Sequence, residues 1–315
     1  MADALVIQDT TYAGEAASAF IVKAITGNDT MNGGNAYLKD GIKKKFTIPR
    51  WDSDYESLIQ DRMATPTSKG TMTVTGQAIT PADYMIYMEF DPRDFEEQWF
   101  ATQLDDRLID RSLPYSAESV VVQGVMARHQ KYFNKAMWLN NTSNAAPSIY
   151  RYWDGWVTKA SDSTLSQKVT SPTTLDVSNI QAEFLRGYNK IPIALRYDPN
   201  MKYYVSYATY DLYAQSQINQ TYKGVDTTQE GVPTFKGKQV VRIADFPDNT
   251  FIIAKGMATT ESNLWVGINS ISDEGLVLRQ LQANSELWFV KLLMKADVNY
   301  GWDEEVVYYG PVINP

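Results

Sequence analysis

The sequence predicts an α+β fold, and three observations predict it. Between Ser116 and about Asn140, apolar residues recur at spacings of three and four, which is typical of a long amphipathic helix. Residues 84–91 alternate between apolar and polar, and residues 286–300 favour one very long strand. The expected order is an arm, a projecting hairpin, a strand and the long helix, an α/β insertion and a return on a long strand, so we expect the first and last parts of the chain to share one sheet.

Length and composition limit the possible functions. With 315 residues the chain can bury a large core in one or two domains. Its 29 Lys+Arg against 37 Asp+Glu give a net charge of −8, which argues against a sequence-specific nucleic-acid binder. This charge still allows a surface that tolerates nucleic acid without holding it tightly.

Few residue types suited to metal or thiol chemistry are present. The chain has no Cys, which excludes disulfides, thiolate zinc sites and Cys nucleophiles. The single histidine, His129, excludes a His-cluster metal site. We therefore expect no metal and no cofactor. The start of the sequence lacks the features of a signal peptide, and no apolar run is long enough to span a membrane. These features predict a cytoplasm-like compartment.

The first 81 residues favour extended structures that cannot fold alone. Residues 1–41 are small and polar, apart from a short apolar run over 19–25, and are predicted to form an N-terminal arm. Residues 42–81 are predicted to form a long β-hairpin, with Phe46 and Ile48 on one face and a polar connection over 52–70. A hairpin with so little apolar surface is marginal in water, so we expect it to lie on something else.

The predicted helix over 116–140 is the longest element. Ser116 is its candidate N-cap, Glu118 suits the positive end of the helix dipole, and Lys131 and Lys135 lie toward the negative end. At about 1.5 Å per residue the helix is roughly 35 Å long and needs a sheet or a subunit to cover its apolar face. That face consists of Val122, Val125, Met126, His129, Tyr132, Phe133, Ala136 and Met137. Residues 91–110 also favour a helix.

The second half mixes short helices and strands. Residues 178–188 predict a helix with a capping box formed by Ser178 and Gln181. A strand over 201–206 is followed by a Tyr-rich helix over 207–218. Further strands are predicted over 237–246, 250–256, 263–269 and 306–309.

No stretch predicts catalysis, and we name no catalytic, cofactor or metal residue. Residues 231–239 resemble a phosphate-binding loop but have the wrong glycine spacing and lack the Ser or Thr that binds Mg²⁺. Residues 52–63 begin like a calcium loop but lack its glycine and its final Glu. His129 lies on an apolar stripe, which favours packing over general-base chemistry. The tyrosines at 203, 204, 207, 210 and 213 could stack on sugars or bases, although packing in a core or an interface is favoured.

The order of these elements resembles the major capsid proteins of tailed bacteriophages, which have the Hong Kong-phage-type shell fold. The resemblance implies an N-terminal arm at 1–41 and an extended loop at 42–81. It implies a peripheral domain at 82–175 with its spine helix at 116–140, an axial domain at 176–280, and a return to the peripheral domain at 281–315. Residues 235–269 resemble the central sheet of the axial domain.

The resemblance implies a structural protein without catalytic activity. Such proteins assemble as hexamers and pentamers into an icosahedral shell around double-stranded DNA, which they contact non-specifically, without a membrane. Scaffolding, portal and decoration or cement proteins are implied partners, and the implied location is the virion capsid, assembled in the host bacterial cytoplasm. Some relatives cross-link a loop Lys to an Asn. Lys69 has a suitable position, but the strand entry Trp288-Phe289-Val290-Lys291 lacks the Asn, so we expect no cross-link.

Two other hypotheses remain open. An encapsulin-type bacterial nanocompartment shell shares the fold and encloses enzyme cargo, although the long hairpin and the arm favour the phage hypothesis. An aromatic-rich carbohydrate-active enzyme would need a cleft with two carboxylates about 5–10 Å apart.

Overall fold

The computed structural model describes residues 10–12, 22, 26–53, 62, 72–91, 115–170, 172–218, 233–269, 276–281 and 287–311. Its strands are β1 (Thr10–Tyr12), β2 (Tyr37–Lys39), β3 (Phe46–Thr47), β4 (Arg50–Ser53), β5 (Met72–Thr75), β6 (Ala78–Ile79), β7 (Ala82–Phe90), β8 (Gln167–Lys168), β9 (Met201–Ser206), β10 (Thr234–Phe235), β11 (Lys238–Ile243), β12 (Phe251–Lys255), β13 (Leu264–Ile268), β14 (Leu276–Gln280), β15 (Trp288–Tyr300) and β16 (Val307–Tyr309). Its helices are α2 (Asp29–Asn32), α4 (Tyr115–Leu139), α5 (Trp156–Asp162), α6 (Ile180–Lys190) and α7 (Tyr207–Ile218), with short 3₁₀ turns η3 (Ile193–Leu195) and η4 (Asp303–Glu305).

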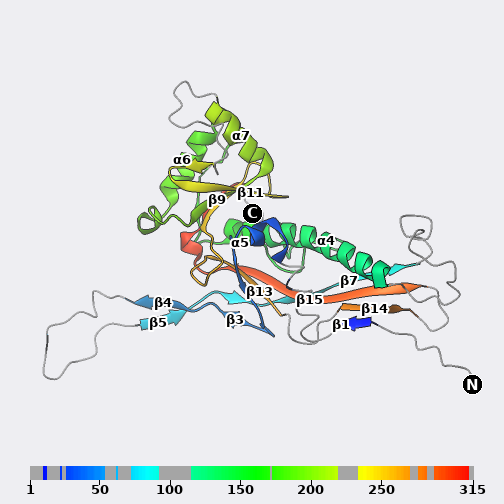
Figure 1. The fold of residues 1–315 in the computed structure, drawn as a ribbon. Coiled ribbons are helices and arrows are strands. Elements are labelled where there is room, and N and C mark those ends of the chain that lie inside the picture. Colours follow the sequence, from blue (N-terminus) through cyan, green and yellow to red (C-terminus); the bar gives the residue numbers. More distant parts are fainter. Residues whose placement is uncertain are drawn as a thin grey trace, which may run out of the picture.

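The first sheet joins early and late parts of the chain. Its strand order is β1-β14-β15-β13-β2, and β7 also pairs with β15. β7 runs antiparallel to β15 along its whole length, from Ala82 opposite Ala296 to Phe90 opposite Trp288. The prediction that the first and last parts of the chain share a sheet is therefore confirmed. In Figure 1 the long β15 runs below α4, with β14 and β1 beyond it.

Strand partners correct one prediction. The sequence places residues 263–269 in the same sheet as residues 237–256, but β13 lies between β15 and β2 in the first sheet. β16 shows the reverse case. It follows β15 of the first sheet along the chain, yet it pairs with β12 in the second sheet. Alternation within a strand shows which faces are buried, but it does not identify the neighbouring strand.

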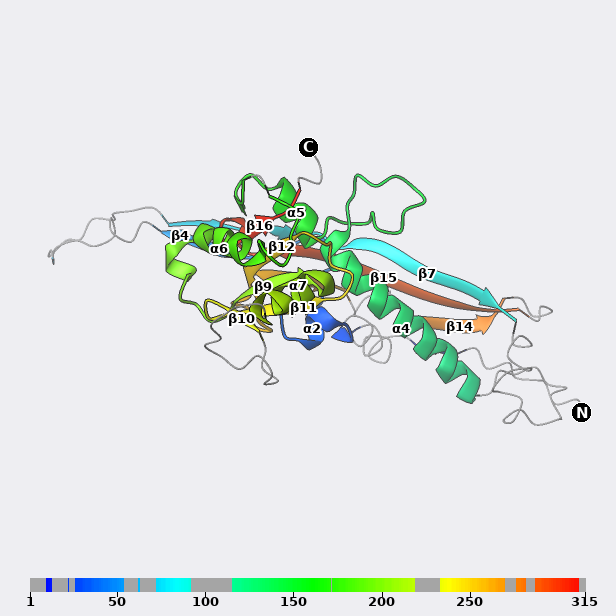
Figure 2. The ribbon, with the colours of Figure 1, turned by 90° about the horizontal axis from the view of Figure 1, so that it is seen from above.

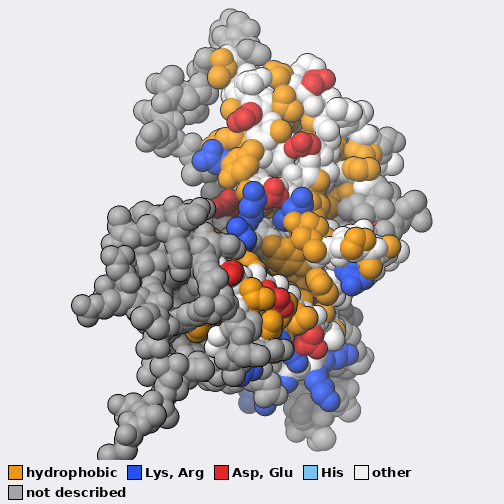
Figure 3. Space-filling view, turned by 90° about the vertical axis from the view of Figure 1, so that its right-hand side faces the viewer, with side chains coloured by type: hydrophobic (Ala, Val, Ile, Leu, Met, Phe, Trp, Pro, Cys, Tyr) orange, Lys and Arg blue, Asp and Glu red, His pale blue; other side chains and the backbone are white. Residues whose placement is uncertain are grey.

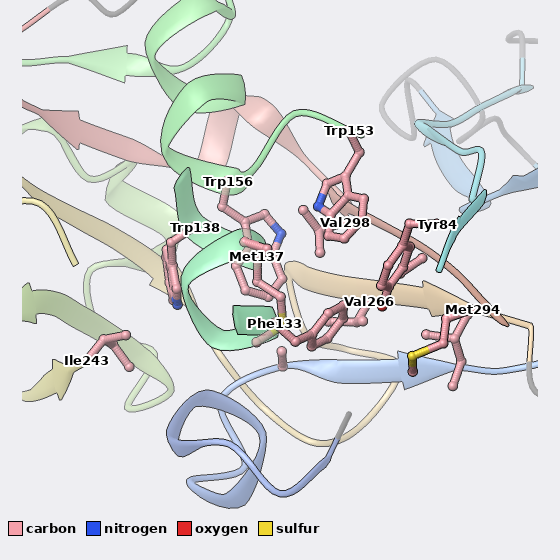
Figure 4. Packing of buried hydrophobic residues seen from close by; sticks show 14 of the residues in the cluster. Tyr84, Phe133, Met137, Trp138, Trp153, Trp156, Ile243, Val266, Met294 and Val298 are labelled. Carbon is pink, nitrogen blue, oxygen red and sulfur yellow. The ribbon is translucent and has the colours of Figure 1, made fainter. Parts of the chain in front are cut away.

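The long helix α4 covers one face of the first sheet. It begins at Tyr115, one residue before the predicted N-cap Ser116, and ends at Leu139, so the predicted helix is confirmed and the cap position is corrected. Helix ends commonly shift by a residue or two. The predicted apolar stripe is buried apart from Tyr132, which is half-buried. Figure 4 shows Phe133 of α4 beside Val266 of the sheet, and Met137 of α4 beside Trp156.

The second sheet is buried on both faces. Its strand order is β10-β11-β9-β12-β16-β8. In β12, Phe251 and Ile253 pack with residues of α6 and α7, whereas Ile252 and Ala254 belong to the core that contains α4. Successive side chains of a strand point to opposite faces, so a strand buried on both sides reads as a continuous apolar run. This explains the unbroken apolar sequence of residues 251–254.

Trp138 joins the helix to the second sheet. Its ring centroid lies 4.8 Å from Trp156 of α5, 5.1 Å from Phe246 and 5.2 Å from Tyr204 of β9. All four aromatic side chains are buried. Fully burying one large apolar side chain contributes about 1.5–3 kcal/mol, so this cluster couples the two sheets into one core.

The structure describes the proposed capping box and part of the loop over residues 231–239. The capping box of Ser178 and Gln181 is wrong, because the Ser178 hydroxyl donates to Asp176 Oδ1 at 2.6 Å and Gln181 Nε2 donates to the Ser216 hydroxyl at 3.1 Å. In the loop that departs from the phosphate-binding motif, the described residues form a glycine turn before β11. Lys236 and Gly237 have φ of 47° and 76° in a two-residue turn between β10 and β11, a conformation that suits glycine.

Several predictions lie outside the described residues. These are the helix over 91–110, apart from Asp91, the tip of the hairpin with Lys69, the later part of the calcium-like loop, and most of the apolar run over 19–25.

Candidate assembly surfaces

The hairpin β3–β6 with β4–β5 is the most prominent projection. At its base, β3 pairs with β6, and farther out β4 pairs with β5 from Arg50 opposite Thr75 to Ser53 opposite Met72. Figures 1 and 2 show β4 and β5 extending past the body of the molecule. Among the described residues, these two strands pair only with each other. The predicted hairpin is therefore present, and its outer part has no covering layer within the described chain.

An apolar cluster fixes the base of the hairpin to the first sheet. Ile42, Ile48 and Ile79 are buried around Trp265 of β13. Gly267 of β13 allows the hairpin to come this close, because a Cβ there would lie 2.3 Å from Ile79 Cγ2. The base is thus held by side-chain packing in addition to backbone hydrogen bonds.

Asp297 of β15 fixes the base by polar contacts. Its Oδ2 accepts a hydrogen bond from the Thr80 amide at 2.8 Å, and its Oδ1 lies 3.4 Å from Lys159 Nζ of α5. Asn299, two residues along the same strand, donates from Nδ2 to the Ala78 carbonyl at 2.7 Å. Burial raises the pKa of the Asp297 carboxyl, while Lys159 opposes that shift. These contacts set the direction in which the hairpin leaves the body.

Part of the predicted arm is built into the body. The Thr30 hydroxyl donates to Asn134 Oδ1 at 2.8 Å and accepts from Trp138 Nε1 at 3.0 Å. Asn134 Nδ2 in turn donates to the Ala244 carbonyl at 3.0 Å. β2 (Tyr37–Lys39) adds a parallel strand beside β13. Sequence reasoning missed these links, since a three-residue strand and single polar contacts leave no periodic signal.

Exposed apolar side chains mark further surfaces. Tyr197 is 88% exposed and Ile193 is 76% exposed, both around η3, and Met85 of β7 is 60% exposed. Figure 3 shows hydrophobic side chains between charged groups of both signs on one end of the molecule. Single exposed apolar residues are common on proteins, so these positions alone do not define an interface.

The candidates for chemistry are mostly part of the core. His129 is 1% exposed, and its Nε2 lies 2.9 Å from the Tyr84 hydroxyl. Tyr203, Tyr204 and Tyr213 are buried, and burial raises the pKa of Tyr213 to about 12. Among the tyrosines for which stacking on sugars or bases was the alternative to packing, Tyr207 is exposed, with the Arg242 guanidinium carbon 5.6 Å from its ring centroid. Packing therefore accounts for His129 and for the three buried tyrosines.

Searches for metal and membrane sites give simple results. Within the described part of the chain, no group of three or more His, Asp or Glu residues could hold a metal ion. No helix among the described residues is both long and apolar enough to cross a membrane.

Comparison with solved structures relates this architecture to known assemblies. The chain is similar to a chain of the satellite phage P4 procapsid, with a TM-score of 0.64 and 12% identity over 96% of this chain and 93% of the other. It is similar to a chain of the capsid of cyanophage P-SCSP1u, with a TM-score of 0.57 and 10% identity over 90% of this chain and 89% of the other. For a virus-like particle from Pyrococcus furiosus the TM-score is 0.52, with 8% identity over 94% and 99%. No protein-family model and no curated protein matches the sequence.

The chain has the fold of capsid-shell proteins, and the match covers nearly the whole length of both chains. More particularly, the fold is the tailed-bacteriophage major capsid fold, with the long helix, the first sheet and the projecting hairpin described above.

Proposed function

We propose that the protein is the major capsid protein of a tailed bacteriophage, a structural subunit without catalytic activity. It assembles as hexamers and pentamers into an icosahedral shell that encloses double-stranded DNA. The observation that carries the proposal is the hairpin, whose outer strands β4 and β5 pair only with each other among the described residues. Such a ribbon is marginal alone in water, and a neighbouring subunit in a shell would supply the surface that it lies on.

The proposal includes a division into domains. Residues 1–41 form the arm, 42–81 the extended loop, 82–175 and 281–315 the peripheral domain, and 176–280 the axial domain. Sheet pairing supports two adjustments: β13 and β14 join the peripheral sheet through β15, and β16 joins the axial sheet through β12.

Partners and location follow from the same proposal. Scaffolding, portal and decoration or cement proteins would bind the assembled shell, which would be built in the host bacterial cytoplasm and become the virion capsid. Contact with the packaged DNA would be non-specific, and no Lys69 cross-link would form.

Electron microscopy of the expressed full-length protein tests the proposal. We expect closed particles of uniform size or hexameric rings in negative stain. A monodisperse monomer under all salt and protein concentrations would contradict shell formation.

A nanocompartment shell is the second candidate, because the fold also matches the virus-like particle from Pyrococcus furiosus. The contents of particles purified from the native source separate the two candidates. Double-stranded DNA inside supports the capsid, and an enclosed enzyme supports the nanocompartment. An active glycan-cleaving monomer would instead support the carbohydrate-enzyme hypothesis.

A further inference from the structure

The middle of the chain contains basic residues with no acidic residues between them. Between Glu118 and Asp154 the sequence contains four basic residues and no Asp or Glu, although the whole chain has a net charge of −8. Three of the four lie on α4: Arg128, Lys131 and Lys135.

These three side chains form a stripe on the solvent face of the helix. Spacings of three and four residues place them on one side of α4. Arg128 and Lys131 are exposed and Lys135 is half-buried. The opposite side of the same turns carries buried residues such as Met126 and Phe133, which pack against the first sheet. At about 1.5 Å per residue the stripe extends about 10 Å along the helix. We call Arg128, Lys131 and Lys135 the basic stripe.

Acidic neighbours do not compensate the stripe evenly. Within the described residues, neither Arg128 nor Lys131 forms an ion pair. Lys135 Nζ lies 5.1 Å from the centroid of the Tyr150 ring, and burial, with a smaller contribution from Asp245, raises the pKa of the Tyr150 hydroxyl. An acidic group is therefore near the Lys135 end, and the charge is least compensated at Arg128 and Lys131.

The helix dipole does not explain the stripe. The dipole stabilises cations near a helix C-terminus, and the effect falls off beyond the last turn. α4 ends at Leu139, so Arg128 and Lys131 lie two to three turns before the end. An exposed helix face that serves only for solubility usually mixes both signs.

The opposite face of the first sheet has mixed charges. Lys295 Nζ lies 3.1 Å from Asp83 Oδ1 on the neighbouring strand β7. Glu89 of β7 lies opposite Phe289, and the Arg279 guanidinium carbon is 5.6 Å from that same ring. The helix and the sheet thus form two sides of one layer. Among the described residues, the sheet side includes the ion pair of Lys295 with Asp83, whereas no Asp or Glu lies between Arg128 and Lys135 along α4.

We propose that the basic stripe of α4 faces the interior of the shell and contacts the phosphates of packaged double-stranded DNA. This inference rests on the proposed function, and it assigns the inner face of the subunit. Duplex DNA carries about one negative charge per 1.7 Å of its axis, so any sequence offers phosphates to a stripe of this length. Three cations on an acidic subunit give weak contact that depends on salt and not on sequence.

DNA binding by the unassembled full-length chain tests the stripe. The variant carries Arg128→Gln, Lys131→Gln and Lys135→Gln, and the matched control carries Arg279→Gln, Lys291→Gln and Lys295→Gln on the opposite face. Fluorescence anisotropy measures the affinity for a short random-sequence duplex as a function of salt, and circular dichroism verifies folding. We expect the slope of log K against log salt to shrink in the stripe variant by about 0.9 for each lost phosphate contact, with little change in the control. Equal slopes for the wild type and the stripe variant would overturn the proposal.

Lysine accessibility in wild-type particles tests the direction of the stripe. An amine-reactive group attached to a polymer too large to cross the shell is applied to intact and to disrupted particles, and labelled peptides are identified by mass spectrometry. We expect Lys131 to be labelled only after disruption, and labelling in intact particles would overturn the inference. If no particles form, the proposed function fails, while the DNA titration still decides whether the stripe binds phosphate.

Discussion

Gly155 allows a close contact between the start of α5 and the end of α4. Its amide donates to the Asn140 carbonyl at 2.7 Å, and a Cβ at this position would lie 2.5 Å from the Trp138 carbonyl oxygen. That neighbour is backbone and cannot rotate away. The local requirement is a residue without a side chain.

A pair of Gly→Ala substitutions tests this requirement. Gly155→Ala should lower the free energy of unfolding by about 1–3 kcal/mol through overpacking. Gly124→Ala is the control, since no described residue lies within 4 Å of a Cβ there, and it should raise that energy by about 0.5–1 kcal/mol because Gly is unfavourable inside a helix. Urea unfolding of the unassembled chain measures both. Equal midpoints would contradict the packing described for Gly155.

The pKa of Asp297 predicts a dependence of stability on pH. Burial raises the pKa of this carboxyl above its ordinary value of 3.8. The folded state therefore keeps the proton at pH values where the unfolded chain has released it. The stabilising contribution is fully present below 3.8 and is lost as pH rises through the raised pKa of the folded state.

The control for this titration is Asp297→Asn, which has no charge at any pH. The free energy of unfolding of the wild type, measured relative to that of the variant, should fall as pH rises from 3.8 and then become constant. A difference that grows over the same interval would show that Lys159 and the backbone donors outweigh burial.

At the residue scale, local sequence patterns predicted which side chains are buried more readily than they predicted the hydrogen-bond partners of those side chains. The burial of His129 could be predicted because its position on the apolar stripe determines it. The partners of Ser178 could not, because Asp176 Oδ1 accepts from both the amide and the hydroxyl of Ser178, and also from the Asn179 amide, which is a local alternative to a capping box. Asp297 carries no sequence signal, since its partners Thr80 and Lys159 lie more than a hundred residues away.

Among the elements, α4 should depend on its buried stripe. Phe133 is fully buried, so Phe133→Asp places a carboxylate without a partner in the core. The free-energy cost of burying this carboxylate is comparable with the whole free energy of unfolding of a typical protein, about 5–15 kcal/mol. We therefore expect a chain that does not fold or assemble. Ala127→Asp on the exposed side of the same helix should stay folded. Circular dichroism and electron microscopy measure these outcomes, and normal particles from Phe133→Asp would contradict the packing of α4.

The hairpin should separate folding from assembly. Ile48 donates its amide to the Gln77 carbonyl at 2.8 Å, so a two-residue Asn-Gly turn can replace residues 49–76 and leave the apolar base intact. We expect the free energy of unfolding to change by less than about 1 kcal/mol, because shortening a loop has a small effect. The same variant should form no closed particles. Particles of normal size would mean that the hairpin plays no part in contacts between subunits.

The sequence predicted some elements more readily than others. β7, α4, β9, α7 and β15 are long or strongly periodic, and the structure has each of them near its predicted bounds. β1, β2 and β14 were missed because they are short and gain their stability from partners elsewhere, such as Leu278 opposite Thr10. The sequence also could not predict to which sheet β13 belongs, because its partners β15 and β2 lie elsewhere in the sequence.

At the scale of the whole molecule, the features support the proposal that the chain is a subunit of a larger assembly. One core joins both sheets through Trp138, whereas the hairpin extends beyond it and apolar side chains at η3 remain exposed. The chemical groups that sequence reasoning considered for catalysis are largely packed in that core. An extended subunit with these properties suits a thin wall made of many copies.

A cryo-electron-microscopy reconstruction of particles formed by the full-length chain tests this account most directly. We predict a closed icosahedral shell in which subunits surround fivefold and sixfold positions, and in which residues 42–81 of each subunit lie over a neighbour. A chain that remains a monomer, or a shell in which the hairpin folds back on its own subunit, would contradict it.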